Sequence, residues 1–377
     1  MSSGPLVTVY IPCRNYGSYL RQSVESVIAQ LYVNWELIII DEASSDNTMK
    51  ISQEFVDEYP EKITFIHNKT PQGLQKLANN VLNIANGKYM MRLDADDWLD
   101  ESALLLLLTK IESSRKAGLI YGNYYYTDNE GKVIGVEMRE AIGDDDFSNQ
   151  LPPHGACTLF RTRALKSAGG YSENVDAQDG WDLWYKLANQ IGATSIQAPI
   201  FYYRQHGDSM SRDNERLLKA RSKIFEQAAT KLEGDYKPKT VAVIPVKESY
   251  PDFKNVPYQE IKGKSLLEIA ISNASQSNKI ETIIVSSESQ KVLDFSKNLE
   301  KEGKVPSHLR LLRKNKKGSE KSKSIPIREF MTIAGNFYKE FNQCYPDIMI
   351  FLSMHAVNRR NDHIDKALNI LRITQGD

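Results

Sequence analysis

The sequence has little cysteine, no net charge and no long apolar segment. Its three cysteines, Cys13, Cys157 and Cys344, are far apart among 377 residues and form no Cys-x-x-Cys pair. This spacing excludes a zinc ribbon and a disulfide framework, and it fits a reducing compartment. Lys plus Arg and Asp plus Glu both number 48. Because proteins that bind the phosphates of nucleic acid are usually basic, this balance disfavours nucleic acid as a partner.

Apolar runs in this sequence are short. None approaches the roughly 18 residues that a membrane span needs. The longest pure run, residues 104–108, is flanked by Asp100, Glu101 and Lys110 and predicts a helix that faces the core. The N-terminus has no basic region followed by an apolar one, so we expect no signal peptide. We therefore expect a cytoplasmic protein, with peripheral attachment to the inner face of the membrane left open.

The first half of the chain alternates strand-like and helix-like segments. Strand-like runs lie at residues 7–11, 37–40, 63–66 and 89–93, and helix-like segments at 19–30, 46–55 and 74–85. This repetition predicts a mainly parallel sheet with helices on both faces. The length of the chain predicts two domains, or three.

Polar and acidic residues follow three of these strands. They are residues 12–15, Asp41 with Glu42, and 94–97. In such sheets ligands bind beyond the carboxyl ends of the strands. Clustered carboxylates repel one another, and a Mn²⁺ or Mg²⁺ ion would keep them ionised and could bridge a diphosphate. The alternative is that Asp97 or Asp100 caps the following helix.

Three segments together resemble the successive motifs of family 2 glycosyltransferases. They are VYIPCRNYGSYL at 9–20, LIIIDEASSDNT at 37–48 and GKYMMRLDADD at 87–97. The resemblance covers residues 5–212 and implies the GT-A fold, a Rossmann-like mixed sheet. It also implies a nucleotide-diphospho-sugar as the donor.

The resemblance implies a nucleotide site in the first two loops. Pro12, Arg14 and Asn15 match the loop that cradles the nucleotide. Asp41 matches the acid that binds the base, commonly at N3–H of uracil. Glu42 stands where a second Asp is usual, so the choice of donor base stays open.

Further residues match the family's donor and metal motifs. Asn79 matches the Asn of the helix before the Asp-x-Asp strand, and Asp94 would contact the ribose or the sugar. Asp96 would bind the metal, and His206 could complete the metal site. Arg204, in the segment that looks like the family's Tyr-Arg-x-His motif, could offset phosphate charge.

The resemblance assigns Asp179 as the catalytic base. An ionised carboxylate near the acceptor hydroxyl suits this role, and attack opposite the diphosphate would invert the anomeric centre. Gln178 stands where many relatives have Glu, and Asp182 is the alternative base. A purely structural alternative is that Asp179 is a helix N-cap. His154 is either a residue that faces the acceptor or a turn residue.

A charged helical linker at 213–238 leads to a second alternating series at 239–377. This series resembles the N-terminal half of cytidylyltransferases that make CMP-activated acidic sugars, over residues 239–373. Those enzymes carry a glycine-rich loop after the first strand, whereas residues 247–254 contain no glycine. We therefore expect a nucleotidyltransferase-like α/β domain that is partial or inactive, serving assembly, docking or a homo-oligomer.

The preferred hypothesis is a metal-dependent, inverting glycosyltransferase at 1–212. Its expected substrates are a UDP-sugar donor and a glycan or lipid-linked glycan acceptor of the bacterial surface, the latter by family association. One alternative is a bifunctional enzyme that also forms CMP-sugars. The other is a scaffold that binds sugar nucleotides without turnover.

Overall fold

The computed structural model describes residues 4–139, 154–206, 213–234, 236–306, 309–313, 327–360 and 362–374. The chain forms two compact units, Met1–Ala228 and Ala229–Asp377. The division falls within the segment that the sequence predicts as a helical linker. Each unit is described by itself below.

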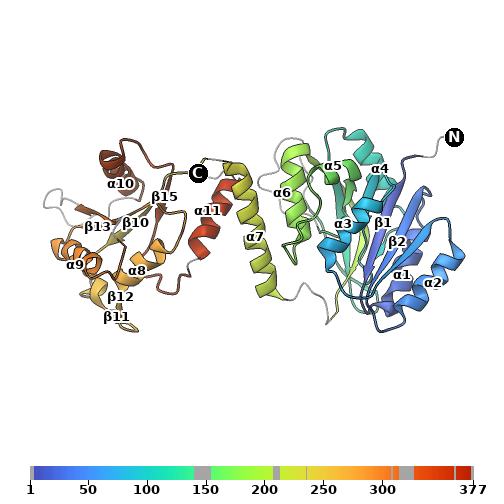
Figure 1. The fold of residues 1–377 in the computed structure, drawn as a ribbon, viewed down its shortest axis with the longest axis horizontal. Helices are drawn as coiled ribbons and strands as arrows, with labels where there is room; N and C mark the ends of the chain where they lie inside the picture. Colours follow the sequence, from blue (N-terminus) through green and yellow to red (C-terminus); the bar gives the residue numbers. More distant parts are fainter. Residues whose placement is uncertain are drawn as a thin grey trace. The chain divides into compact units, whose positions relative to one another are not determined.

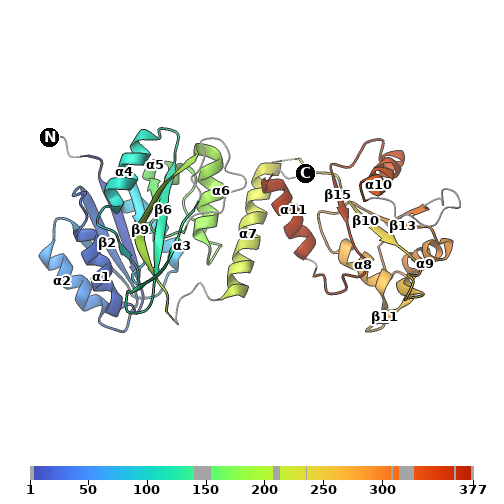
Figure 2. The same ribbon diagram turned by 180° about the vertical axis from the view of Figure 1, so that it is seen from behind.

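The first unit alternates strands and helices over most of its length (Figures 1 and 2). Its strands are β1 (Val7–Cys13), β2 (Trp35–Glu42), β3 (Ile63–Asn68), β4 (Tyr89–Arg92), β5 (Trp98–Leu99), β6 (Leu119–Thr127), β7 (Val133–Glu137), β8 (Leu159–Arg161) and β9 (Ala193–Arg204). Its helices are α1 (Gly17–Ile28), α2 (Thr48–Glu58), α3 (Leu74–Ile84), α4 (Ala103–Ser113), α5 (Thr162–Ser167), α6 (Asp179–Ile191) and α7 (Asn214–Glu233), which continues into the second unit.

The strands of the first unit form one mixed sheet. Its order is β3-β2-β1-β4-β8-β6-β9-β5, with β7 paired to β6. Strands β1 to β4 are parallel, whereas β8 runs antiparallel to β4 and β6. The register pairs Cys13 with Asp41 and Tyr10 with Arg92. The carboxyl ends of β1, β2 and β4 therefore lie at the same edge, as the alternating pattern predicts.

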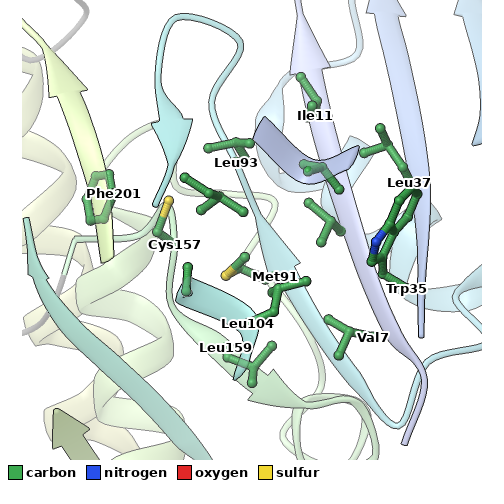
Figure 3. Close-up of a cluster of buried hydrophobic side chains, with 14 of the residues drawn as sticks. Val7, Ile11, Trp35, Leu37, Met91, Leu93, Leu104, Cys157, Leu159 and Phe201 are labelled. Atoms are coloured by element: carbon green, nitrogen blue, oxygen red, sulfur yellow. The ribbon is translucent and has the colours of Figure 1, made fainter. Parts of the chain in front are cut away.

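The inner strands are mostly apolar because helices cover both faces of the sheet. Val9 and Leu37 lie in a buried cluster with side chains of α1, α2 and α4. Their neighbours Tyr10 and Ile38 lie in a second cluster with side chains of α3 and α6. Figure 3 shows part of the first cluster, including Leu37 on β2 and Leu104 on α4. Successive residues of each strand thus pack into opposite layers.

The five-leucine run falls in α4 and is only partly directed at the core. Leu104, Leu107 and Leu108 are buried, whereas Leu105 and Leu106 are 42% and 38% exposed. A helix turns about 100° per residue, so consecutive side chains cannot all face one layer. The N-cap residue is Ser102, so neither Asp97 nor Asp100 has that position. Over the described residues, no helix combines the length and hydrophobicity that a membrane span requires.

The second unit is a smaller α/β structure, as the second alternating series predicts. A four-stranded parallel sheet has the order β14-β13-β10-β15, and β11 and β12 form a separate pair. Its strands are β10 (Thr240–Val246), β11 (Glu260–Ile261), β12 (Lys264–Ser265), β13 (Thr282–Ser287), β14 (Leu309–Arg313) and β15 (Ile348–Phe351). Its helices are η2 (Val256–Tyr258), α8 (Leu266–Ser275), α9 (Gln290–Lys301), α10 (Ile327–Asn342) and α11 (Asp362–Thr374). Its resemblance to cytidylyltransferases stays a prediction.

Candidate active site

The loop after β1 is joined to the loop after β2. Pro12 is half-buried near the end of β1, and Arg14 and Asn15 are exposed just beyond it. The backbone N–H of Asn15 donates to Ser44 Oγ over 2.8 Å, and its side-chain Oδ1 accepts from the N–H of Ser45 over 2.8 Å. The predicted nucleotide loop therefore lies against the acidic end of β2, at the carboxyl edge of the sheet.

Asp41 is buried at the end of β2. Its Oδ2 lies 2.8 Å from Nδ1 of His67, at the end of the neighbouring strand β3, and its Oδ1 accepts from the N–H of Ser44 over 2.9 Å. The Asp41 side chain has no exposed surface. A nucleotide base could reach this carboxylate only if His67 or the loop at Ser44 moved away from it. Contact between Asp41 and a base stays a prediction.

Glu42 and Asn79 bind parts of the chain that precede the helices α3 and α6. Glu42 Oε2 accepts from the N–H groups of Gln72 and Gly73 over 2.7 and 3.1 Å. Asn79 donates from Nδ2 to the carbonyl of Tyr171 over 3.0 Å, and its Oδ1 accepts from the N–H of the same residue over 2.8 Å. Both side chains stabilise loops in this structure, and their contact with a nucleotide stays a prediction.

A buried arginine joins two of the predicted site acids. Arg92 ends β4 and is 5% exposed. Its Nε lies 2.8 Å from Asp94 Oδ1, and its Nη1 donates to Asp179 Oδ2 over 2.6 Å. Burial alone would lower the pKa of Arg92, but the carboxylates of Asp179 and Asp94 raise that pKa above its usual value. The charged guanidinium therefore brings the predicted donor-side and acceptor-side acids together.

Asp179 is the first residue of α6. Gln178 is the N-cap residue and has a left-handed backbone with φ 62°, so the hypothesis that Asp179 is the N-cap is wrong. The positive end of the helix dipole favours a negative charge at this position. A Cβ atom on Gly155 would lie 2.7 Å from Asp179 Oδ2. Glycine at 155 therefore leaves the space that the carboxylate occupies.

Asp182, the alternative base, is bound within the protein. Its Oδ2 accepts from the N–H of Ser172 over 2.9 Å and from Nζ of Lys186 over 2.9 Å. Its Oδ1 accepts from the hydroxyl of Ser172 over 2.9 Å. These bonds give Asp182 a clear structural role in holding the segment before α6, and they favour Asp179 over it as a reactive group.

His154 lies among aromatic rings next to the acids of the site. Its ring centroid is 4.7 Å from that of Tyr203 and 5.8 Å from that of Tyr124. Burial lowers the pKa of His154, which favours the neutral form of its imidazole. Its buried Nδ1 has no hydrogen-bond partner in the part of the chain that the structure describes. Contact with an acceptor stays a prediction for this residue.

The two predicted metal ligands touch each other. Asp96 Oδ2 lies 2.8 Å from Nε2 of His206. Arg204 is buried between the rings of Tyr19 and Trp98, with its guanidinium 4.8 and 4.7 Å from their centroids. Its Nε donates to the carbonyl of Asp96 over 2.9 Å. Arg204 thus holds the loop that carries Asp96, and a contact with phosphate stays a prediction.

The residues around Asp96 fit a metal that also binds the donor. The described residues contain no group of three His, Cys, Asp or Glu side chains arranged to hold a metal. Asp96 and His206 offer a carboxylate and an imidazole, and Mg²⁺ or Mn²⁺ can take its other ligands from phosphates and water. Burial and the charges of Asp96 and Asp94 raise the pKa of Asp97 well above its usual value. A cation nearby would relieve this repulsion.

Three residues of the site were assigned no role from the sequence. Arg92 lies inside the third motif, and the signal that could have found it is a basic residue in an otherwise apolar, buried strand. His67 follows the strand-like run at 63–66, so the rule that selected Asp41 would have selected it too. Gly155 carries no such signal, because its role depends on how closely Asp179 approaches it.

Comparisons with known proteins agree with the motifs. Residues 8–169 match the family described as glycosyl transferase family 2. Glycosyltransferase GlyG of Streptococcus pneumoniae is 30% identical over 235 residues, which is 57% of this chain and 76% of GlyG. Chondroitin synthase of Escherichia coli is 28% identical over 208 residues, and hyaluronan synthase of Pasteurella multocida 27% over 210. These matches cover 55% of this chain in both cases, but only 30% and 21% of the two synthases.

Similar solved structures include one bound to a nucleotide and one bound to a nucleotide sugar. S. aureus TarS in complex with UDP has a TM-score of 0.48 and 15% identity, and the match covers 60% of this chain and 65% of that one. A mannosyltransferase from Pyrobaculum calidifontis in complex with GDP-Man and Mn²⁺ has a TM-score of 0.45 and 19% identity, over 61% and 65% of the two chains. The family match and the identity to GlyG show that this chain belongs to glycosyl transferase family 2, and the mixed sheet of its first unit is the GT-A-like α/β fold that the motifs predict.

Proposed function

We propose that this chain is a metal-dependent, inverting glycosyltransferase that moves a sugar from a UDP-sugar to a hydroxyl of a bacterial glycan. One observation carries the proposal. A single buried guanidinium, that of Arg92, binds both Asp94 in the loop after β4 and Asp179 at the start of α6. An acid suited to the donor and an acid suited to the acceptor therefore lie within reach of one bond-forming event.

In the proposed reaction, Asp179 accepts the proton of the acceptor hydroxyl. The acceptor oxygen forms a bond to the anomeric carbon while the bond from that carbon to the diphosphate oxygen breaks. Because attack and departure occur on opposite faces, the anomeric centre is inverted. Arg92 holds the Asp179 carboxylate in place, and Gly155 leaves room for it. Such general base catalysis accelerates reactions by about 10²- to 10⁴-fold.

The proposed metal site consists of Asp96 and His206. A bound Mn²⁺ or Mg²⁺ would stabilise the charge that develops on the departing diphosphate. Arg204 and Asp97 stabilise the loop that carries Asp96, because the backbone N–H of Arg204 donates to Asp97 Oδ1 over 2.9 Å. The loop after Leu93 is thereby held to the end of β9.

The relatives support a glycan as the acceptor. Two of them are named as synthases of chondroitin and hyaluronan, which are polymers of sugars. This chain covers less than a third of either protein, so the choice of polymer does not follow from them. A glycan or a lipid-linked glycan of the cell surface fits the same chemistry, an attacking sugar hydroxyl.

Calorimetric titration tests the donor site. UDP, CDP, GDP and CTP are each titrated into the full chain, with and without Mn²⁺. We expect UDP to bind in a Mn²⁺-dependent way and Asp96→Ala to weaken it by at least about 10-fold, since even groups behind a metal's direct ligands contribute this much. Asp57→Ala, which removes an exposed acid from α2, is the matched control.

The other outcomes of this titration contradict parts of the proposal. If the affinity for UDP changes neither when Mn²⁺ is added nor in Asp96→Ala, the proposed metal site is wrong. CTP binding that survives Asp96→Ala would indicate a nucleotide site elsewhere and favour a bifunctional enzyme. If UDP binds in a metal-dependent way but a separate turnover assay detects no release of nucleoside diphosphate with any donor and sugar acceptor, a scaffold without turnover is favoured.

A further inference from the structure

The loop that leads to Asp179 rests on α7. Figures 1 and 2 both show α7 beside α6. Basic side chains of α7 bind this loop at three places. Arg216 Nε donates to Asp176 Oδ2 over 3.3 Å, Arg221 Nη2 and Nε donate to Gln178 Oε1 over 2.8 and 3.2 Å, and Lys223 Nζ donates to the carbonyl of Asn174 over 2.6 Å. The polar contacts thus span residues 174–178, up to the residue before Asp179.

Apolar contacts hold the same loop to the same face of α7. Val175 is buried in a small cluster with Ala220 and Ile224. At the start of α6, the guanidinium of Arg221 lies 4.2 Å from the ring centroid of Trp181. An arginine over an indole face is attracted to it, and this attraction grows as water is excluded. Arg221 therefore contacts Gln178, just before Asp179, and Trp181, in the first turn of α6 after it.

Gln178 needs such support because of its backbone. Its φ of 62° is a left-handed conformation that few residues other than glycine adopt. Its carbonyl accepts from the N–H of Trp181 over 2.9 Å, so the same residue forms the first turn of α6. The orientation of Gln178 sets the direction in which the side chain of Asp179 leaves the backbone. A change at Gln178 would move the carboxylate away from Arg92.

We propose that Arg221 is a positioning residue of the transferase, acting through Gln178 to aim Asp179 at the acceptor. The inference rests on the proposed role of Asp179 as the base. It lies outside the family match, which ends at residue 169. In this chain a helix that the sequence marks only as a charged linker becomes part of the support of the catalytic centre.

Kinetics of the full chain test this inference. The variants are Arg221→Ala, Arg221→Lys and Gln178→Ala, with Lys231→Ala as the control, since Lys231 is exposed in the last turn of the same helix. Release of nucleoside diphosphate is measured with the donor and acceptor that the wild type turns over fastest. We expect Arg221→Ala to lower kcat about 10- to 100-fold, the effect of a small misplacement of a reacting group. The KM for the donor and the Kd for UDP should not change, and Arg221→Lys should recover part of kcat.

A double variant distinguishes a specific contact from general loosening of the helix. If Arg221 acts through Gln178, the double variant Gln178→Ala with Arg221→Ala should be no slower than the slower single variant. Hydrogen exchange should become faster at residues 174–182 in Arg221→Ala but not in Lys231→Ala. The inference would be overturned if the losses of kcat in the two single variants multiplied in the double variant. It would also be overturned if Lys231→Ala lost as much kcat as Arg221→Ala. If Arg221→Ala does not fold, Arg221→Lys and Gln178→Ala still decide the question through the split between kcat and KM.

Asp179→Asn separates this inference from the proposed function. If that variant keeps full transfer, Asp179 is not the base and the proposed function fails. If it is inactive while Arg221→Ala and Gln178→Ala keep the wild-type kcat, the base stands and only the role of Arg221 is wrong.

Discussion

Both units of the chain are α/β structures with neighbouring parallel strands, and they differ at the ends of those strands. In the first unit, the acids Asp94 and Asp96 beyond β4 contact a buried arginine and an imidazole. In the second, Glu248 after β10 is bonded by Ser289 over 2.7 Å and lies 3.3 Å from Nζ of Lys291. That carboxylate contacts a hydroxyl and an exposed ammonium of its own unit, and no buried arginine or imidazole contacts it among the described residues. Parallel strands bring their carboxyl ends to one edge of a sheet. The residues just beyond the strands determine whether a reaction can be catalysed at that edge.

The largest expected effect comes from exchanging an acid for an amide in each unit. Asp179→Asn keeps the shape of the side chain but cannot accept a proton, so transfer should fall by about 10²- to 10⁴-fold. Glu248→Gln, the matched change in the second unit, should leave the rate unchanged. Both are measured as release of nucleoside diphosphate, with UDP binding as the check on folding. Comparable losses in the two variants would break the comparison.

The ion pairs of the two units should differ strongly in their contribution to stability. Arg92→Met leaves the buried carboxylate of Asp179 and the partly exposed carboxylate of Asp94 without their guanidinium, so it should lower the free energy of unfolding by about 3–5 kcal/mol. In the second unit, Arg360 pairs with Asp362 over 3.4 Å, and their side chains are 70% and 46% exposed. Arg360→Met should change stability by at most about 1 kcal/mol. Urea unfolding followed by circular dichroism measures the free energy of unfolding of both variants. Equal losses of stability in the two variants would show that the ion pairs of Arg92 do not contribute more than the exposed pair.

Glycines of the two units should respond in opposite ways to an added methyl group. In Gly155→Ala the new Cβ would meet Asp179 Oδ2, so we expect kcat to fall about 10-fold as the carboxylate moves. Gly335 lies in α10, where a Cβ would be 3.5 Å from Met349 Sδ, an ordinary contact. Gly335→Ala should raise the free energy of unfolding by about 0.5–1 kcal/mol, because alanine favours helix. A Gly155→Ala enzyme with full kcat would show that the carboxylate has room to spare.

The smallest effect concerns the thiols. Their rates of chemical modification should differ between the two units, and the modification should not change stability. Burial raises the pKa of Cys13 to about 11 and that of Cys157 well above its usual value. Fewer thiolates form as the pKa rises, so both should resist iodoacetamide at pH 8. Cys344 of the second unit is partly exposed and should react. Peptide mass mapping locates the label, and rapid modification of Cys13 would indicate that the loop after β1 opens in solution.

Much of the first unit could be predicted from local patterns. The apolar run at 37–40 predicts a strand covered on both faces, and Ile38 and Ile39 do pack into opposite layers. The helix-like segment at 74–85 is α3, and Leu77, Val81 and Leu82 lie on its buried side. These patterns succeed because strand and helix periods are properties of consecutive residues. The run at 104–108 succeeds only in part, since its exposure depends on which side of α4 the sheet covers.

The sequence by itself determined which acids follow the strands and that the strands end at one edge. The partners of those acids depend on tertiary structure. Arg92 and Asp179 are 87 positions apart and meet because the apolar face of α6 packs on the sheet beside β4. Likewise, only packing against α7 brings Arg221 to Gln178, 43 positions before it in the chain. Periodicity shows that a helix has an apolar face, but the face that it meets is decided by the summed packing of the whole unit.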